Sequence, residues 1–366
     1  MQNAPPLPSC PNFQKPKGLA KVWREVKRPF QIKVETWENM KELHAHKSKI
    51  DAIFNESGKT VFDSLLRFYR WKLIFGRSIT RFLRIPEPRL GSAIAKYLGA
   101  DLEKEIQSTA EAWILDGIKL PHPLNKKDKK GFEFELPDCV YSSYFKHNFK
   151  NFDHYCDLIE NHLKDFNEGP YEYGNVYLKE GDIVFDCGAN RGLFSAVASR
   201  YRCQVFALEA VPDVIDNYLS KTANLNGNIH IHNVAVWDKE EMLTFFFHPG
   251  KIGGSSVSQS SQKVPANYRQ LTVQAITLDT FVERNGIERV DFIKADIEGA
   301  ERSMLRGAKR ILKEFAPKLS ICTYHLPDDP QVLREIILDA NPKYQIIEKF
   351  KKMYAYVPSL EQSKRQ

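Results

Sequence analysis

The chain has 366 residues, of which 42% are hydrophobic and 27% are charged, a balance typical of folded globular proteins. This length allows one large domain with an appendage, or two domains. No apolar run is long enough for a membrane-spanning helix, and the Pro-rich start "MQNAPPLPSC" lacks the apolar core of a secretory signal. The six cysteines include no C-x-x-C pair, which argues against a zinc site or a disulfide framework and favours a reducing compartment. We therefore expect a cytoplasmic protein.

The net charge of +7 is unevenly distributed along the chain. Residues 1–130 contain 25 Lys and Arg against 14 Asp and Glu, whereas the remainder contains 28 against 32. Residues 1–130 therefore carry a net charge of +11, and residues 131–366 carry a net charge of −4. We expect these two regions to have different electrostatic roles.

The N-terminal region is predicted to be a tail followed by helices. Residues 1–20 are rich in proline, so a disordered tail is expected. Residues 21–130 form a basic region that is predicted to be helical, and its clearest helix spans residues 61–85, where arginines lie opposite Leu, Phe and Ile. This basic face either packs on the rest of the protein or makes a peripheral contact with an anionic membrane surface. Nucleic acid is the least favoured partner, because no RNA-binding signature is present.

From residue 177 onward, predicted strands and helices alternate. The predicted strands are 182–187, 204–210, 229–237, 289–299 and 318–325, and a closing antiparallel hairpin spans 344–357. The predicted helices are 192–201, 212–226, 300–316 and 328–341, while residues 242–286 contain strand and loop with a short helix after Leu278. This alternation predicts an α/β fold with a Rossmann-like, doubly wound, mostly parallel sheet that carries helices on both faces.

The first strand of this series ends at Asp186 and is followed by the loop "CGANRG". In an open parallel sheet, ligands bind beyond the carboxyl ends of the strands, where the strand order reverses. Gly188 and Gly192 would let the backbone approach a ligand closely. Glu209 ends the next strand about twenty residues later, where an acid can hold two ribose hydroxyls. A nucleoside is therefore the expected ligand.

The loop does not match the fingerprint of a dinucleotide site. In G-x-G-x-x-G, a helix N-terminus holds the pyrophosphate. Here Asp186 occupies the place of the first glycine, where a carboxylate repels phosphate but suits a cationic ligand. The pattern D-x-G-x-N-x-G with the later Glu209 therefore favours S-adenosylmethionine, which carries ribose and an ammonium group but no phosphate. A tight strand-to-helix turn without a ligand is the alternative, but it explains only the glycines.

These motifs carry a resemblance to a known family. The segments that match, in chain order, are "GDIVFDCGANRGLFS", "ALEAVPD", "NVAVWD", "GGSSV", "TLDTF", "VDFIKADIEGAE" and "MYAYV". With this order and spacing, the chain resembles the FkbM-type methyltransferases, a branch of the S-adenosylmethionine-dependent O-methyltransferases. The resemblance covers residues 168–357, the core of a domain expected at 131–366.

The resemblance implies an enzyme with a class I methyltransferase fold and suggests roles for particular residues. The residues that would line the cofactor are Asp186, Gly188, Asn190 and Gly192, with Glu209 on the ribose and with Asn233, Ala235 and Trp237 near the adenine. The acceptor would be a hydroxyl of a small molecule or glycan. The sugar assignment follows from the resemblance alone.

Methyl transfer to an alcohol requires alignment of the reactants and a base that takes the hydroxyl proton. Asp296 and Glu298 lie two residues apart at the end of a predicted strand, so they share a face if the strand extends that far. We expect Asp296 to hold or activate the acceptor, with Glu298 in support. His325 ends the next strand and has a pKa suited to a base near neutral pH. Alternatively, Glu298 and Glu301 complement a helix N-terminus, and His325 is structural.

Other residues near these acids have two interpretations each. Lys294 either contacts an anionic substrate or forms an ion pair. Asp296, Glu298 and His325 together could hold a hard divalent cation, but the resemblance does not require a metal and we do not favour one. The hydroxyl-rich loop at 248–262 is either a lid or a plain solvent loop, and the candidate substrate-side residues on it are Gly254, Ser255 and Ser256.

Two other function classes remain open from the sequence. The first is a nicotinamide-dependent oxidoreductase, against which Asp186 argues by its place in the loop. The second is a non-catalytic binding protein that retains a vestigial cofactor pocket. The intact loop and the acids that follow the later strand argue against this second class.

Overall fold

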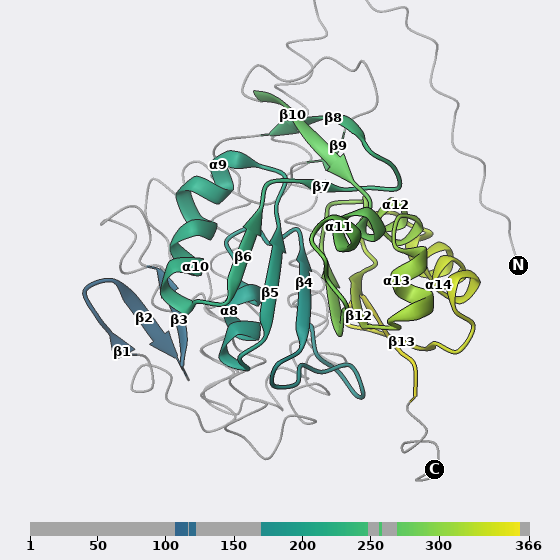
Figure 1. Ribbon diagram of the computed structural model, residues 1–366, viewed down its shortest axis with the longest axis horizontal. Helices are drawn as coiled ribbons and strands as arrows, with labels where there is room; N and C mark the ends of the chain where they lie inside the picture. The colour runs from purple at the N-terminus through teal and green to yellow at the C-terminus, as the bar shows by residue number, and fades with distance from the viewer. Residues whose placement is uncertain (1–106, 116, 122–169, 248–255, 258–268, 359–366) are drawn as a thin grey trace, which may run out of the picture. The chain divides into compact units, whose positions relative to one another are not determined.

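A computed structural model describes residues 107–115, 117–121, 170–247, 256–257 and 269–358 (Figure 1). The predicted tail at 1–20 and the basic helix at 61–85 lie outside the described residues. None of the helices in the described ranges combines the length and the apolar character that crossing a bilayer requires.

A seven-stranded sheet forms the centre of the described structure, with the strand order β6-β5-β4-β11-β12-β14-β13. Its strands are β4 (Ile183–Cys187), β5 (Gln204–Leu208), β6 (Ile229–His232), β11 (Phe292–Ala295), β12 (Lys318–Cys322), β13 (Gln345–Lys349) and β14 (Lys352–Tyr356). The strands from β6 to β12 run parallel, and β14 is antiparallel to both of its neighbours. The predicted mostly parallel sheet with a closing antiparallel hairpin is therefore confirmed.

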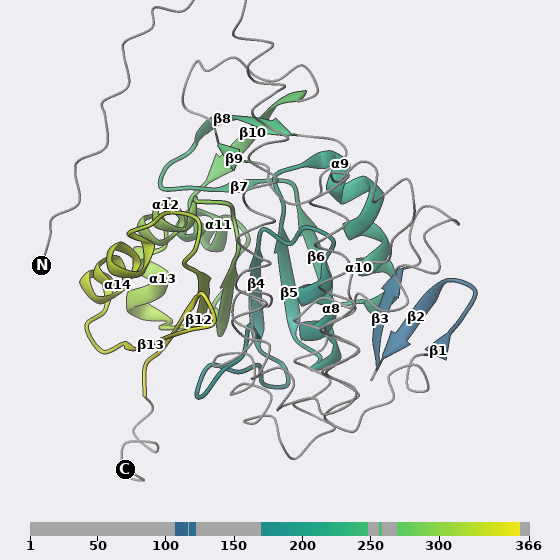
Figure 2. The same ribbon diagram turned by 180° about the vertical axis from the view of Figure 1, so that it is seen from behind.

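Helices cover this sheet, as Figures 1 and 2 show from opposite sides. The helices that follow β4 and β5 are α8 (Leu193–Arg200), α9 (Pro212–Val214), the π-helical η3 (Ile215–Leu219) and α10 (Ser220–Asn226). The later helices are α11 (Leu278–Arg284), α12 (Glu301–Arg306), α13 (Lys309–Glu314) and α14 (Asp329–Ala340). The main core lies between the sheet and α11, α12, α13 and α14.

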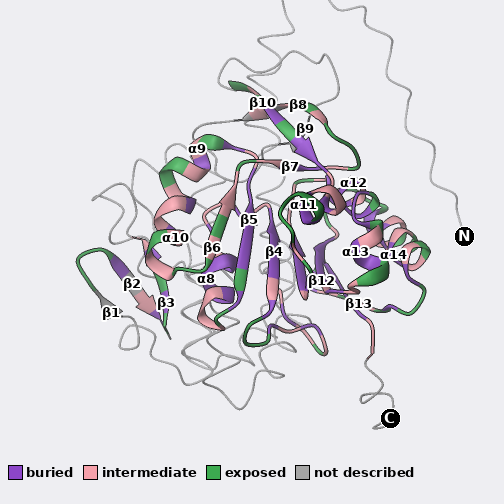
Figure 3. Cartoon of the chain, viewed as in Figure 1, coloured by how far each residue is buried: buried purple, intermediate pink, exposed green. Residues whose placement is uncertain are grey.

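Alternation along the strands assigns each side chain to one face of the sheet. Phe185 and Cys187 of β4 belong to the main core, whereas Asp186 points to the opposite face and accepts a hydrogen bond from Ser195 of α8. In the same way, Ile293 and Ala295 of β11 lie in the main core, whereas Phe292 and Lys294 point to the opposite face. Figure 3 shows the buried residues concentrated on the central strands. Asp186 and Lys294 thus lie side by side on the sheet face that carries α8.

The expected helix at 300–316 is divided into α12 and α13 at Gly307. A Cβ atom at Gly307 would overlap with the carbonyl oxygen of Trp237 and would lie 3.1 Å from Cβ of Thr277. The carbonyl oxygen of Gly307 accepts a hydrogen bond from the backbone N–H of Asp279 at 3.0 Å instead of continuing the helix. Tertiary packing therefore overrides the helical periodicity at this point.

A second sheet has the order β7-β10-β8-β9. Its strands are β7 (Ala235–Val236), β8 (Glu241–Phe247), β9 (Ser256–Val257) and β10 (Arg269–Ile276). The prediction of one strand over 229–237 is wrong, because β6 belongs to the central sheet and β7 to this one. The break falls at Asn233, whose side-chain amide donates to the carbonyl oxygens of Glu209 and Ala210, both at 3.0 Å.

The described residues between 107 and 121 form three antiparallel strands, β1 (Gln107–Ser108), β2 (Ala112–Leu115) and β3 (Ile118–Pro121). The prediction that residues 21–130 are helical is therefore wrong for this stretch. Gly117, with φ of +80°, lies between β2 and β3, and such a conformation ends a helix and favours a tight turn. Asn226 of α10 exchanges hydrogen bonds with the backbone of Lys119, so this small sheet packs on the helical layer.

Candidate active site

The strand order reverses between β4 and β11, so the loops after these strands meet at the switch point of the sheet. We name residues 188–192 the β4 loop and residues 296–300 the β11 loop. A Cβ atom at Gly188, where φ is +71°, would overlap with the carbonyl oxygen of Asp296. The backbone N–H of Asp296 donates to the carbonyl oxygen of Cys187 at 3.2 Å. Gly188 therefore packs closely on the β11 loop, and its contact with a cofactor stays a prediction.

Gly192 precedes the first residue of α8 and has φ of +76°. A Cβ atom there would lie 2.6 Å from Cδ1 of Leu219 and 3.1 Å from Cγ2 of Thr222. Because a side chain at this position would collide with η3 and α10, this glycine permits the start of α8 to pack against them. In the structure this glycine shapes the loop, and its place in the cofactor lining stays a prediction.

Glu209 follows β5 and contacts the β4 loop. Its carboxylate accepts hydrogen bonds from the backbone N–H groups of Asn190 at 2.8 Å and Val211 at 2.9 Å. The side chain is buried, and this burial raises the pKa of Glu209 even though the two N–H groups act to lower it. Glu209 therefore contacts the D-x-G-x-N-x-G loop directly, and its contact with a ribose stays a prediction.

Asn190 carries the feature of this loop that fits a ligand. Its backbone has φ of +52°, which Asn tolerates better than most residues. Its Oδ1 is buried and has no hydrogen-bond partner among the described residues. A buried acceptor without a donor is costly in a folded protein unless a ligand or water supplies one. The loop therefore fits a cofactor that offers N–H or O–H donors.

Asp186 is fully buried and is engaged by protein groups on both carboxylate oxygens. Oδ1 lies 3.0 Å from Nζ of Lys294, and Oδ2 accepts a 2.6 Å hydrogen bond from the Ser195 hydroxyl. Asp186 and Lys294 are direct cross-strand neighbours in β4 and β11. No part of Asp186 reaches the surface in this conformation. Contact between Asp186 and a cofactor stays a prediction that the structure does not support.

Lys294 lies two residues before the β11 loop and contacts the backbone where the β4 loop begins. Its Nζ donates to the carbonyl oxygens of Gly188 at 2.8 Å and Cys187 at 3.3 Å, in addition to its ion pair with Asp186. Burial acts to lower the pKa of Lys294, but the nearby carboxylates of Asp186 and Asp296 outweigh it and raise the pKa, so the side chain is cationic. Of the two interpretations, the ion pair is the one found, and the 4% exposure does not support contact with a substrate.

The three residues assigned to the adenine lie in different environments. Asn233 holds the backbone of Glu209 and Ala210, as described above. Ala235 is buried in the core of the second sheet, and Trp237 packs against that core. Only Asn233 is therefore tied directly to the β5 end, and contact of these residues with adenine stays a prediction.

Asp296 opens the β11 loop, one residue after the end of β11, so the expected extension of the strand to Glu298 is wrong. Its Oδ2 accepts a 2.9 Å hydrogen bond from the Tyr171 hydroxyl, and its Oδ1 accepts one at 3.2 Å from Tyr324. Burial acts to raise the pKa of Asp296, but Lys294, the Tyr171 hydrogen bond and His325 outweigh it and hold the pKa below its usual value. Asp296 is therefore an ionised hydrogen-bond acceptor.

His325 lies in the segment after β12 and faces the β11 loop. Its Nδ1 is 3.0 Å from Oε1 of Glu301, and its Nε2 is 3.5 Å from Oδ1 of Asp296 and 3.8 Å from Oε2 of Glu298. Burial acts to lower the pKa of His325, but the three carboxylates outweigh it and raise the pKa. The structure thus brings together Asp296, Glu298 and His325, as predicted from the strand ends.

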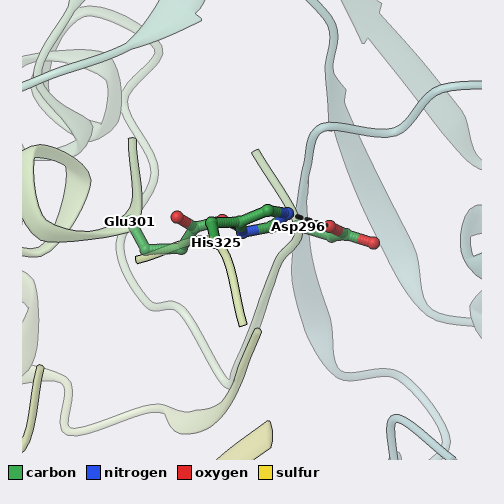
Figure 4. A group of neighbouring side chains, drawn as sticks. All are labelled: Asp296, Glu301 and His325. Carbon is green, nitrogen blue, oxygen red and sulfur yellow. Dashed lines mark ion pairs between the residues drawn. The ribbon is translucent and has the colours of Figure 1, made fainter. Parts of the chain in front are cut away.

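A divalent cation is the alternative occupant of this cluster, since Asp296, Glu301 and His325 offer ligand atoms within 4.8 Å of one another. Figure 4, however, shows the imidazole of His325 between the two carboxylates. Both oxygens of Glu301 already accept backbone N–H groups, from Ile297 at 2.8 Å and Gly299 at 3.0 Å. A cation needs ligand atoms that converge on one point. The arrangement favours a row of ion pairs through His325 over a metal site.

Sequence reasoning missed three residues of this cluster, Tyr171, Tyr324 and Lys352. The Tyr171 ring packs edge-on against Phe194, and Nζ of Lys352 and Nζ of Lys294 lie 4.6 and 5.4 Å from its centre. Lys352 is 1% exposed although lysine is rarely buried. The available signal was a lysine at the start of the otherwise apolar strand "KMYAY".

The predicted substrate-side loop is described only for a few residues. Gly254 and Ser255 lie outside the described residues, as does most of the proposed lid. Ser256 belongs to β9, where its backbone pairs with Phe246 of β8. The contribution of this loop to substrate binding stays a prediction.

Comparison with known proteins places this site in a family. Residues 186–361 match the methyltransferase FkbM domain. Over 168 residues the chain is 23% identical to the hexuronic acid methyltransferase AglP of Haloferax volcanii. This alignment covers 46% of this chain and 66% of that protein. The chain is 25% identical over 171 residues to the 31-O-demethyl-FK506 methyltransferase FkbM of Streptomyces tacrolimicus, covering 39% of this chain and 66% of that protein. The chain therefore spans slightly less than two thirds of the length of each of these relatives.

Among solved structures, a methyltransferase FkbM from Methylobacillus flagellatus is similar to this chain, with 16% identity and a TM-score of 0.38. The alignment covers 82% of this chain and 71% of that one. The family match itself begins at Asp186 and includes the β4 loop, Glu209, the β11 loop and His325. The resemblance recognised from the motifs is thus confirmed for residues 186–361, which match the methyltransferase FkbM domain.

Proposed function

We propose that the chain is an S-adenosylmethionine-dependent O-methyltransferase whose acceptor is a hydroxyl of a sugar or glycan. The observation that carries this proposal is the family match over 186–361, which includes both sides of the switch point. The buried and unpartnered Oδ1 of Asn190, next to the carboxylate of Glu209, supports a nucleoside ligand at the same place. The sheet order supports it as well, since ligands of such sheets bind at the reversal.

The cofactor would be held by the β4 loop and the end of β5. Glu209 would accept hydrogen bonds from ribose hydroxyls, because each of its oxygens has a lone pair beyond the one used by the loop N–H groups. Oδ1 of Asn190 would accept a donor from the cofactor. When bound, S-adenosylmethionine supplies a methyl group on a positively charged sulfur, which an oxygen nucleophile can attack.

The acceptor would bind beside Asp296 and His325. Asp296 is ionised, so it can accept a hydrogen bond from the acceptor hydroxyl and fix the direction of its lone pair. His325 would take the hydroxyl proton on Nε2 while the acceptor oxygen forms its new bond to carbon. Glu298, at 3.8 Å from Nε2, would stabilise the resulting imidazolium.

Two observations support a sugar as the acceptor. Tyr324 is 39% exposed and Leu326 is 38% exposed, and both flank His325 in the chain. An exposed tyrosine ring beside a carboxylate offers an apolar face and polar partners at once, as a pyranose requires. In addition, a relative of this chain is named as a hexuronic acid methyltransferase.

The test has two stages and uses the full chain. Calorimetric titration should show binding of S-adenosylmethionine and none of a nicotinamide dinucleotide. The protein is then incubated with cofactor labelled in the methyl group and with separate glycan, lipid-linked glycan and RNA fractions. Label in a glycan fraction supports the proposal. Binding of the nicotinamide dinucleotide alone, or cofactor binding without transfer to any fraction, would contradict it.

A further inference from the structure

Glu301 is a buried acid whose contacts exceed what capping a helix requires. It is the first residue of α12 and has no exposed surface. Its two oxygens accept the backbone N–H groups of Ile297 and Gly299, which fixes the carboxylate against the β11 loop. Its Oε1 also lies 3.0 Å from Nδ1 of His325. The carboxylate is therefore held rigidly in one place, and His325 is its only side-chain ion-pair partner among the described residues.

This contact determines which nitrogen of His325 carries the proton in the neutral ring. A carboxylate accepts hydrogen bonds and cannot donate one, so the neutral imidazole must place its hydrogen on Nδ1 to satisfy Glu301. The lone pair then lies on Nε2. Figure 4 shows that this is the side of the ring facing Asp296. The nitrogen that can accept a proton is thus the one that faces the acceptor side of the site.

We infer that Glu301 is the positioning residue for methyl transfer, because it fixes the His325 tautomer so that Nε2 can receive the proton of the acceptor hydroxyl. This inference rests on the proposed function and extends it. In the step, the O–H bond of the acceptor breaks and its proton moves to Nε2. An electron pair of the acceptor oxygen forms the new bond to the methyl carbon, while the bond between that carbon and the cofactor sulfur breaks and leaves its electron pair on the now neutral sulfur. The imidazolium that results lies among three carboxylates, those of Glu301, Asp296 and Glu298.

The charged and titratable groups around His325 come from several elements. Glu301 is on α12, Asp296 and Glu298 are on the β11 loop, and the Tyr324 ring lies 4.3 Å away on the same segment as His325. Behind Asp296 are Tyr171 and the cations Lys294 and Lys352, which act on Asp296 directly. The acids next to the ring outnumber the cations that reach it, so an imidazolium is favoured there. His325 becomes a proton acceptor only above its own pKa.

The first experiment compares pH–rate profiles of wild type and Glu301→Gln. Glutamine retains one oxygen for a backbone N–H but can donate its amide hydrogen to Nδ1, which moves the ring proton to Nε2. We expect kcat to fall about 10²- to 10⁴-fold, with the KM for the cofactor unchanged. The acid limb of the residual activity should move to lower pH, because the imidazolium has lost a carboxylate. Asp279→Asn is the matched control, since Asp279 also accepts two backbone N–H groups, from Arg310 and Ile311, but has no histidine partner among the described residues.

The second experiment reports the tautomer directly and does not depend on activity. Histidine labelled with ¹⁵N is incorporated into the full chain, and the signals of His325 are identified by their loss in His325→Gln. Above the pKa of the ring, we expect wild type to carry hydrogen on Nδ1 and Glu301→Gln to carry it on Nε2. Wild-type spectra with the hydrogen on Nε2 would overturn the inference even if the variant failed to fold.

The outcomes separate this inference from the function on which it rests. If wild type transfers label and Glu301→Gln loses rate without any shift of the acid limb, Glu301 is merely structural and the inference fails. If wild type transfers no label to any fraction, the proposed function fails, whatever the spectra show. An Asp279→Asn variant that loses as much turnover as Glu301→Gln would also count against a positioning role.

Discussion

The two sides of the switch point are built by different means. The β4 side presents a loop whose contacts are mainly backbone: Gly188 packs on a carbonyl, and Glu209 accepts a hydrogen bond from the N–H of Asn190. The β11 side presents a side-chain network in which Asp296 and His325 are held by hydroxyls and carboxylates. This difference suits the two tasks we propose. A cofactor site needs a fixed shape, whereas proton transfer needs groups whose charge can change.

The pKa values of the carboxylates on the two sides are also shifted in opposite directions. Burial raises the pKa of Glu209, which has two backbone N–H partners but no cation at ion-pair distance among the described residues. Asp296 is also buried, yet Lys294, Tyr171 and His325 hold its pKa low. An ionised Asp296 is favoured by its surroundings, whereas an ionised Glu209 is opposed by them. Variants of each side should therefore have separable effects, except where one residue serves both.

Lys294 is the residue that serves both sides, and its loss should have the largest effect. Lys294→Met leaves the fully buried Asp186 without its cation, and breaking one partner of a buried pair costs about 3–5 kcal/mol. We expect that loss in the free energy of unfolding, measured with urea, together with weaker cofactor binding.

The control for Lys294→Met is Lys318→Met. Lys318 pairs with Asp182 at 2.9 Å near the opposite end of the strands, and its side chain is more exposed, at 18% against 5%. It should lose clearly less stability and keep its cofactor affinity. Equal losses of stability in the two variants would show that the burial of Lys294 against Asp186 has no special importance.

Asp296→Asn should affect turnover and leave cofactor binding intact. The amide is neutral and can misdirect the Tyr171 and Tyr324 hydroxyls that now donate to the carboxylate. We expect transfer of labelled methyl to fall about 10²- to 10⁴-fold, while calorimetry gives a Kd for the cofactor within about twofold of wild type, since Asp296 makes no described contact with Asn190 or Glu209. A variant with normal turnover would move the chemistry away from the β11 side.

Gly188→Ala should separate steric overlap from backbone strain. Alanine there must adopt a positive φ and also overlaps with the carbonyl oxygen of Asp296. Gly181 has φ of +77° with nothing within 4 Å of its Cβ position, so Gly181→Ala carries the strain alone. We expect Gly188→Ala to be less stable than Gly181→Ala by about 1–3 kcal/mol, the usual cost of overpacking, in urea unfolding. Equal stability would mean that the two loops can move apart without cost.

Much of this architecture was predictable because it follows from local periodicity. The strands that end in Asp186 and Glu209 are short apolar runs bounded by turn residues, and the closing hairpin has the same character. The interpretation of Lys294 as an ion-pair partner of nearby acids also followed from its alternation with Asp296 on the predicted strand, although the partner found in the structure is Asp186. These features depend on a few adjacent residues, which the sequence presents together.

The features that could not be predicted depend on contacts between distant segments. Gly188 was expected to allow close approach of a ligand, but nothing in the loop itself reveals that the Asp296 carbonyl lies beside it. Glu301 was recognised as an acid in the first turn of a helix, but its partnership with His325 requires the order of β11 and β12 in the sheet. Tyr171 joins the cluster from a segment 125 residues before Asp296. Local patterns determine elements, whereas partners are determined by topology.

The smallest expected effect concerns the pH dependence of stability. The pKa of Glu209 is raised above its ordinary 4.5, so its contribution to folding is present in acid and is lost as the pH rises through the folded-state pKa. The pKa of Asp296 is lowered from 3.8, so its contribution is present at neutral pH and is lost as the pH falls below that value. With urea unfolding between about pH 3 and pH 7, Glu209→Gln should gain stability relative to wild type as the pH rises, and Asp296→Asn should lose it. Slopes of the same sign would show that the two carboxylates do not sense opposite surroundings, and the contrast between the two sides would fail.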